Sequence, residues 1–236
     1  MTFCPIIKRP VVTLFFSLSL AFFTVTSTYA DAMSEPEIED WFNDDSELSI
    51  EDINEGQLTF ISPLADKNIL STEAVMTITD NSLKTGMVSL RQCYRNLDPV
   101  AEMDVVYSYK NMKQLRIVSV GNIADARVIG NSIQLRDITA SAFVCIAADV
   151  QLLENTAGDS YALSYGPYYR RFLDGYYPYH ATVIIDYPER RLRYADVSPS
   201  QRPMFELVTE PGKLIMDTWF EGVLQVNITF SVIDSD

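Results

Sequence analysis

The alternation of apolar and polar residues constrains this chain more than any other feature. From Leu58 onward, apolar residues recur at every second position in one short run after another, and the last run carries Leu224, Val226, Ile228, Phe230 and Val232. A period of two is that of a strand with one buried face. Turn-forming residues such as Asp80-Asn81 and Pro211-Gly212 separate the runs. The pattern therefore predicts an all-β, antiparallel sandwich or barrel.

An internal repeat of about 80 residues organises these runs. The segment DVVYSYKNMKQLRIVSV, residues 104–120, resembles TVIIDYPERRLRYADV, residues 182–197. The matching anchors are Tyr109 with Tyr187 and Leu115-Arg116 with Leu192-Arg193. The repeat predicts two tandem antiparallel β-sandwiches, residues 57–153 and 154–236, and the strand rhythm of the second resembles that of immunoglobulin-like modules. The alternative is a chance match, because apolar-polar alternation is a two-letter code.

Residues 1–30 have the features of a secretory signal peptide. Lys8 and Arg9 give a positive start, an apolar stretch follows over residues 10–25, and small residues allow cleavage after Ala30 or Ala32. The apolar stretch is shorter than the roughly 20 residues of a membrane-spanning helix, which argues against an uncleaved anchor. Since no second long apolar run follows, we expect a periplasmic or extracellular protein with no transmembrane segment in its mature chain.

Residues 31–56 form an acidic leader with 11 Asp and Glu residues and no Lys or Arg. Self-repulsion and low hydrophobicity predict that this leader is disordered. Several apolar residues interrupt the acidic ones, and they are Trp41, Phe42, Leu48, Ile50 and Ile53. They suit a short amphipathic helix that docks on a partner or on the protein's own body.

The cysteines point to one disulfide. Cys4 lies in the signal segment, so Cys93 and Cys145 remain in the exported chain. An even pair in an oxidising compartment predicts a bond between them. The alternatives are two free thiols, or one catalytic thiol paired with His180. Each cysteine lies on the more polar face of its strand, so we expect the bond near the rim of a sandwich rather than through its centre.

Composition excludes several classes of function. The formal net charge of −14 disfavours nucleic-acid binding, which needs clustered positive charge. One histidine and three cysteines leave too few ligands for a His- and Cys-rich zinc site, and no metal or cofactor is expected. The sequence contains no G-x-S-x-G, P-loop, G-x-G-x-x-G or H-E-x-x-H motif. A Ser-His-Asp triad would need His180, which instead reads as an outward residue of a strand.

One segment stands apart in composition. Residues 166–180, GPYYRRFLDGYYPYH, combine many tyrosines with charged residues. Tyrosine clusters suit sugar rings, peptides and protein interfaces, and an arginine pair suits a carboxylate or phosphate. The candidate ligand-binding residues are Tyr168, Tyr169, Arg170, Arg171, Asp174, Tyr176, Tyr177 and His180. The alternative is an aromatic turn that only packs between two sandwiches. A second, weaker candidate comprises Asp217, Trp219 and Glu221.

These features favour an exported, non-enzymatic binding or accessory protein of the cell envelope, with another envelope protein or a glycan as its partner. Two other interpretations stay open at this point. One is a hydrolase of an envelope polymer, which requires His180 and carboxylates to converge in one pocket. The other is a structural partner of an envelope or secretion complex, which requires the leader to become ordered on contact.

Overall fold

A computed structural model describes residues 54–64, 69–156, 159–172 and 175–233. The predicted signal peptide, residues 31–53 of the leader and Asp174 lie outside the described residues. The all-β prediction is confirmed, since strands dominate the described residues and the one helix among them is the short α2, Ser82–Thr85. No helix of the described part is long and apolar enough to cross a membrane.

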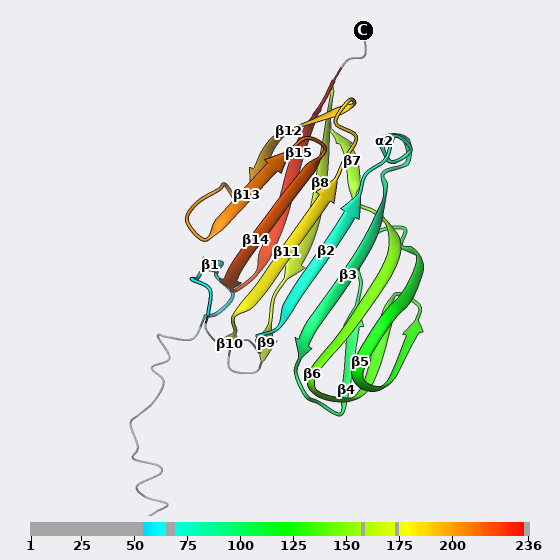
Figure 1. The fold of residues 1–236 in the computed structure, drawn as a ribbon, viewed down its shortest axis with the longest axis vertical. Coiled ribbons are helices and arrows are strands. Elements are labelled where there is room, and N and C mark those ends of the chain that lie inside the picture. The colour runs from blue at the N-terminus through cyan, green and yellow to red at the C-terminus, as the bar shows by residue number, and fades with distance from the viewer. Residues whose placement is uncertain (1–53, 65–68, 157–158, 173–174, 234–236) are drawn as a thin grey trace, which may run out of the picture. The chain divides into compact units, whose positions relative to one another are not determined.

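The strands follow one another closely along the chain (Figure 1). In order they are β1 Thr59–Phe60, β2 Ser71–Thr77, β3 Met87–Leu97, β4 Glu102–Val106, β5 Lys113–Ile129, β6 Ser132–Gln151, β7 Leu153–Thr156, β8 Ser160–Tyr168, β9 Arg171–Phe172, β10 Gly175–Tyr176, β11 Tyr179–Asp186, β12 Leu192–Ser198, β13 Phe205–Glu210, β14 Lys213–Glu221 and β15 Leu224–Val232.

Two sheets make the sandwich. Sheet A has nine strands in the order β1-β14-β11-β2-β3-β6-β4, with β13 also paired to β14 and β5 also paired to β6. Sheet B has four strands in the order β12-β15-β8-β7. Figure 1 shows sheet B behind sheet A, and β9 and β10 form a small separate hairpin at one end.

The core lies between the two sheets. Alternation selects the inward residues, so that on β11 Val183 and Ile185 are buried while Thr182 and Ile184 are only half-buried. Buried side chains from both sheets form one cluster, which includes Met76, Leu90, Ile146, Leu163, Phe220 and Phe230. Each large apolar side chain buried in this way contributes about 1.5–3 kcal/mol. The unbroken cluster explains why Leu48–Asp236 is one compact unit.

The two tandem immunoglobulin-like sandwiches are not confirmed. Strand β11 comes from the second proposed repeat, yet it pairs in parallel with β2 from the first and antiparallel with β14. Residues 57–153 and 154–236 therefore share sheet A and one core. The physical reason is that alternation decides which face of a strand is buried but not which strand pairs with it.

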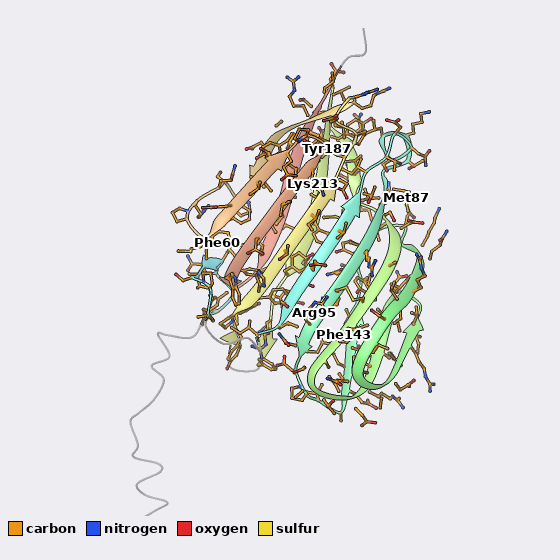
Figure 2. All side chains as sticks on the ribbon, viewed as in Figure 1. Phe60, Met87, Arg95, Phe143, Tyr187 and Lys213 are labelled. Atoms are coloured by element: carbon orange, nitrogen blue, oxygen red, sulfur yellow. A yellow bond between two sulfur atoms is a disulfide. The ribbon has the colours of Figure 1, made fainter. Side chains whose placement is uncertain are left out.

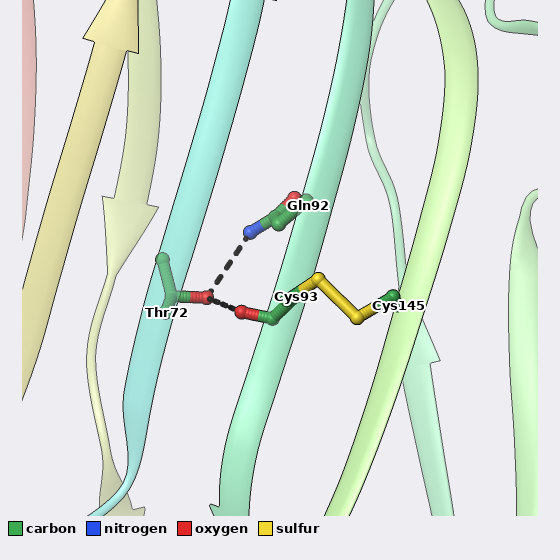
Figure 3. The surroundings of a disulfide bond; sticks show 4 residues. All are labelled: Thr72, Gln92, Cys93 and Cys145. Atoms are coloured by element: carbon green, nitrogen blue, oxygen red, sulfur yellow. Dashed lines mark hydrogen bonds between the residues drawn. A yellow bond between two sulfur atoms is a disulfide. The ribbon is translucent and has the colours of Figure 1, made fainter. Parts of the chain in front are cut away.

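The predicted disulfide between Cys93 and Cys145 is present (Figure 3). The two residues are directly opposite on β3 and β6, with their Cα atoms 4.0 Å apart. The bond does not cross the core, and the polar face expected for both cysteines is the outer face of sheet A. The disulfide joins two interior strands of sheet A, so the expected position near the rim of a sandwich was wrong. Closing a loop with a sequence separation of 52 stabilises the fold by roughly 4 kcal/mol.

Candidate functional site

The aromatic segment 166–180 is divided between the core and the surface. Tyr168 and Tyr179 are 5% and 3% exposed and belong to the core cluster. Tyr168 therefore cannot present its ring on a surface, contrary to its place among the candidate residues. By contrast, Tyr169 is 51% exposed. The division follows from β8 and β11, whose inward positions hold the two buried tyrosines.

Arg170 ties this segment to the loop after β3. Its guanidinium donates to both carboxylate oxygens of Asp98, at 2.6 and 3.3 Å, and both side chains are mostly buried. The same guanidinium lies over the rings of Phe172 and Tyr177, 5.2 and 5.7 Å from their centroids. The acidic partner of Arg170 is thus Asp98, a residue that sequence spacing did not single out. Arg170 holds the end of the sandwich together.

Tyr176 contacts residues 54–56, and Arg171 lies over its ring. The Arg171 guanidinium lies 5.4 Å from the centroid of Tyr176. The Tyr176 ring packs against Gly56, where an added Cβ would come within 3.0 Å of the ring. The backbone N–H of Tyr176 donates to the backbone carbonyl of Asn54. Tyr176 therefore serves mainly to anchor residues 54–56, and a ligand site made of the whole segment stays a prediction.

His180 lies elsewhere, on the outer face of sheet A. Its ring stacks on Trp219 of the neighbouring strand β14, with the centroids 4.4 Å apart and the planes 14° from parallel. Its Nε2 is 3.0 Å from Oδ2 of Asp217, and the Thr182 hydroxyl donates to the same oxygen at 2.7 Å. The hydrogen bond from His180 is the main cause that lowers the pKa of Asp217, with Thr182 acting in the same direction and partial burial opposing both.

This cluster joins residues from two predicted candidates. His180 came from the aromatic segment, and Asp217 and Trp219 came from the weaker one; the β11–β14 register brings them together. Its geometry differs from that of a hydrolase triad, in which a nucleophilic hydroxyl bonds the second ring nitrogen of the histidine. Here the nearby hydroxyl, that of Thr182, is already bonded to Asp217. The cluster offers a flat aromatic surface beside a carboxylate.

A groove runs along the other side of Trp219, and we call it the tryptophan groove. Its volume is about 280 Å³. Apolar side chains form most of its wall and two carboxylates close one side, and the lining includes Ile61, Met204, Glu206, Val208, Asp217 and Trp219. Val208 and Met204 are 52% and 45% exposed, which is unusual for side chains of their size.

A second depression lies above the disulfide, and we call it the arginine hollow. Its volume is about 410 Å³, and it is lined by Glu73, Val75, Arg91, Cys93, Arg95, Ser119, Phe143 and Cys145. Arg95 extends over the ring of Phe143, 6.0 Å from its centroid, and Figure 2 shows the two side by side. Gly121 makes this arrangement possible, because a Cβ there would lie 2.2 Å from the Phe143 ring.

The strand register connects the two depressions. Trp219 is opposite His180, His180 is opposite Ser71, Ser71 is opposite Arg95, and Arg95 is opposite Phe143. These five residues form one row across sheet A, and we call it the outer row. With about 4.8 Å between neighbouring strands, the outer row is about 19 Å long. No pattern in the sequence marks Phe143, and Arg91 and Arg95 only share the more polar face of their strand with Cys93.

Within the described ranges, no three His, Cys, Asp or Glu side chains gather closely enough to hold a metal ion.

Comparisons with known proteins give no family. No protein-family model matches the sequence, and no curated protein matches it. Among solved structures, the chain is similar to a protein of Legionella pneumophila described as a "putative nutrient binding protein". The two are 7% identical, the match covers 76% of this chain and 68% of the other, and the TM-score is 0.36. A likeness at that level says nothing about ligand or activity, so the function has to be argued from this chain's own residues.

Proposed function

We propose that this protein is an exported, non-enzymatic binding protein of the cell envelope, with the outer face of sheet A as its binding surface. The observation that carries the proposal is the outer row. It places an aromatic ring near each end, Trp219 and Phe143, and polar side chains between them. Rings hold the apolar faces of a ligand, while His180, Ser71 and Arg95 offer hydrogen bonds.

The shape favours an extended ligand. The tryptophan groove and the arginine hollow are shallow depressions on one face, whereas a site for a small molecule encloses most of its ligand. Sugar rings present an apolar face and a rim of hydroxyl groups, which matches alternating aromatic and polar side chains. We therefore infer that the ligand is an envelope glycan strand lying across the strands of sheet A.

Two features support export to the envelope. The disulfide is of the kind that persists in oxidising compartments. The first thirty residues combine a positive start, an apolar stretch and small residues, as a secretory signal does.

Binding can be followed through Trp219 itself. The chain has two tryptophans, so a Trp41→Phe protein reports from Trp219 alone. We expect purified cell-wall glycan strands to change Trp219 emission in a saturable way. Arg95→Gln should weaken this binding on the order of tenfold, because it removes a charged hydrogen-bond donor from the middle of the outer row.

The matched control is Arg193→Gln. Arg193 is an exposed residue of β12 in sheet B, so this change removes the same charge from a different face. It should leave the affinity for glycan strands unchanged. Equal loss of affinity in both variants would show a non-specific charge effect, and an unchanged Trp219 spectrum at saturating glycan would reject the proposed binding surface.

A further inference from the structure

The arginine hollow carries positive charge that the described part of the protein leaves unneutralised. Arg91 and Arg95 are exposed, and neither forms an ion pair with a carboxylate of the described residues. The register adds Arg116 to this face, because Ala147 is opposite both Arg91 and Arg116. Two strand spacings, about 10 Å, separate the backbones of Arg91 and Arg116. This face therefore presents several guanidinium groups close together.

The acidic residues of this face do not cancel that charge. Glu73 is the one carboxylate among the described residues that line the arginine hollow, where it faces both Arg91 and Arg95. Asp149 lies further along β6 and has a basic residue of its own, Lys113, directly opposite on β5. The arginine hollow thus holds two positive charges against one negative charge.

The disulfide gives the arginine hollow its depth (Figure 3). Cys93 lies between Arg91 and Arg95 on the same face of β3, and its short, buried side chain leaves the space between the two longer ones empty. Ser119 is opposite Cys145 and adds a hydroxyl group to the wall. The arginine hollow is therefore a concave place with guanidinium and hydroxyl donors, which is the chemistry that binds an anionic group.

The tryptophan groove has the opposite charge. Glu206 and Asp217 line it, and no Lys or Arg side chain is among the described residues that do so. An anionic group is repelled there, whereas an uncharged ring can lie against Trp219. The two depressions therefore give the outer face an acidic end and a basic end, and an extended ligand fits in one direction only.

We propose that the ligand of the outer face is an anionic glycan, with a carboxylate or phosphate group in the arginine hollow and an uncharged sugar ring at the tryptophan groove. This inference rests on the proposed function and adds the charge and the direction of the ligand. Arginine binds either anion through two parallel hydrogen bonds, and such charge-assisted bonds are roughly twice as strong as neutral ones. The net charge of −14 repels anions from the protein as a whole, so an anionic ligand depends on a local group of arginines.

The charge of the ligand can be tested by removing its anionic groups one kind at a time. The probe is purified cell-wall glycan strands in three forms: untreated, with carboxylates converted to methyl amides by carbodiimide and methylamine, and with phosphates removed by hydrofluoric acid. The Trp41→Phe protein reports binding through Trp219. Three strand spacings, about 14 Å, separate Trp219 from Arg95 along the outer row, so the emission follows binding without direct contact with the altered groups.

We expect one of the two treatments to lower the affinity of the parent protein on the order of tenfold, because it removes the partner of the arginines. Loss on amidation identifies a carboxylate, and loss on dephosphorylation identifies a phosphate. Arg91→Gln/Arg95→Gln should bind untreated strands on the order of tenfold more weakly than the parent does. The effective treatment should cause no further loss in this variant, because both changes remove the same contact.

The matched control is Arg190→Gln/Arg191→Gln, which removes two exposed arginines from the turn between β11 and β12 and changes the net charge equally. It should bind all three forms of the strands as the parent does. The comparison of treated and untreated strands on the parent protein needs no variant, so it holds even if a substitution lowers the melting temperature.

Three results would overturn the inference and leave the proposed function standing. They are saturable binding that neither treatment weakens, a treatment effect as large in Arg91→Gln/Arg95→Gln as in the parent, and an equal loss of affinity in both double variants. An unchanged Trp219 spectrum at saturating untreated strands would instead reject the proposed function, and this inference with it.

Discussion

The two faces of sheet A use their aromatic and polar side chains in opposite ways. Beneath the inner face, in the core that sheet A shares with sheet B, the rings of five tyrosines and a phenylalanine follow one another with neighbouring centroids 5.1 to 6.1 Å apart, and they are Tyr107, Tyr109, Tyr165, Tyr168, Tyr179 and Phe220. On the outer face, aromatic rings lie singly beside polar or charged side chains, as Trp219 does beside His180 and Phe143 beside Arg95.

Their hydroxyl groups sharpen the contrast. The buried hydroxyls of Tyr107, Tyr165 and Tyr168 make no hydrogen bond of good geometry in the described structure, although each lies close to the hydroxyl of a neighbouring tyrosine, Tyr107 to Tyr94 and Tyr165 to Tyr168. On the outer face Asp217, Thr182 and His180 are hydrogen-bonded together. A buried hydroxyl without a partner costs about 1–3 kcal/mol. The inner rings therefore stabilise the fold through packing, and the polar groups of the outer face are hydrogen-bonded to one another at the surface.

Removing an inner ring should have the largest effect. Tyr165 is 1% exposed and touches the rings of both Tyr109 and Tyr168. Tyr165→Ala should lower the free energy of unfolding by about 3–5 kcal/mol, as other large truncations in cores do. Tyr169→Ala, at a half-exposed ring, should change it by less than about 1 kcal/mol. Chemical denaturation of both variants makes the comparison.

Tyr165→Phe is the control that separates the contribution of the ring from that of the hydroxyl. It keeps the ring and removes only the hydroxyl, whose contacts with neighbouring tyrosines lack good hydrogen-bond geometry, so stability should change by about 1 kcal/mol or less. A loss of stability comparable to that of Tyr165→Ala would mean that the hydroxyl has a partner, and the contrast between the two faces would then be wrong.

Alkaline pH should disrupt the packing of the buried tyrosines before it affects the outer face of sheet A. Burial raises the pKa of Tyr107 and of Tyr179 to about 12, and it raises the pKa of Tyr165 and Tyr168 well above the ordinary value of 10.0. A pKa that is higher in the folded state means that the unfolded chain loses its tyrosine protons first. Stability is therefore complete below about pH 10 and falls as the pH rises toward 12.

The titration should contain one cooperative step. In that step phenolate absorbance should show the buried tyrosines ionising together with loss of the far-ultraviolet β signal. A single smooth titration of all tyrosines with the β signal intact would contradict the buried cluster.

The local alternation of apolar and polar residues predicted the strands well, but it did not predict which strands pair with one another. Alternation separates inward Val183 and Ile185 from outward His180, as the structure has them, and cysteine parity placed Cys93 and Cys145 on the more polar faces of their strands, although the expected position near the rim was wrong. Alternation holds no information on partners, so the parallel neighbour of β11 was missed.

The candidate site shows the same division. Composition marked residues 166–180, and His180 does lie on the outer face beside Asp217 and Trp219. The same composition also made Tyr168 a candidate, although this residue is buried. Composition alone does not show whether a tyrosine faces the core or the solvent. Arg95 and Phe143 could be joined to His180 only through the register of four strands.

The smallest expected effect comes from Asp217 on the outer face. Its pKa is lowered mainly by the hydrogen bond with His180, so the carboxylate form is favoured more in the folded chain than in the unfolded one. This contribution to stability is complete above the ordinary pKa of Asp and is lost as the pH falls through the lowered pKa of Asp217.

Because the Asp217 side chain is 57% exposed, we expect Asp217→Asn to cost about 0.5 kcal/mol or less at neutral pH. The cost should vanish at strongly acidic pH, where both proteins carry an uncharged group. Asp149→Asn is the matched control for loss of one carboxylate from the same side of sheet A, since Asp149 has no ion pair among the described residues, and at neutral pH it should change stability less than Asp217→Asn does. Urea denaturation of the three proteins across acidic pH measures the difference, and a cost of Asp217→Asn that persists unchanged at the lowest pH would show that His180 and Thr182 do not hold the carboxylate.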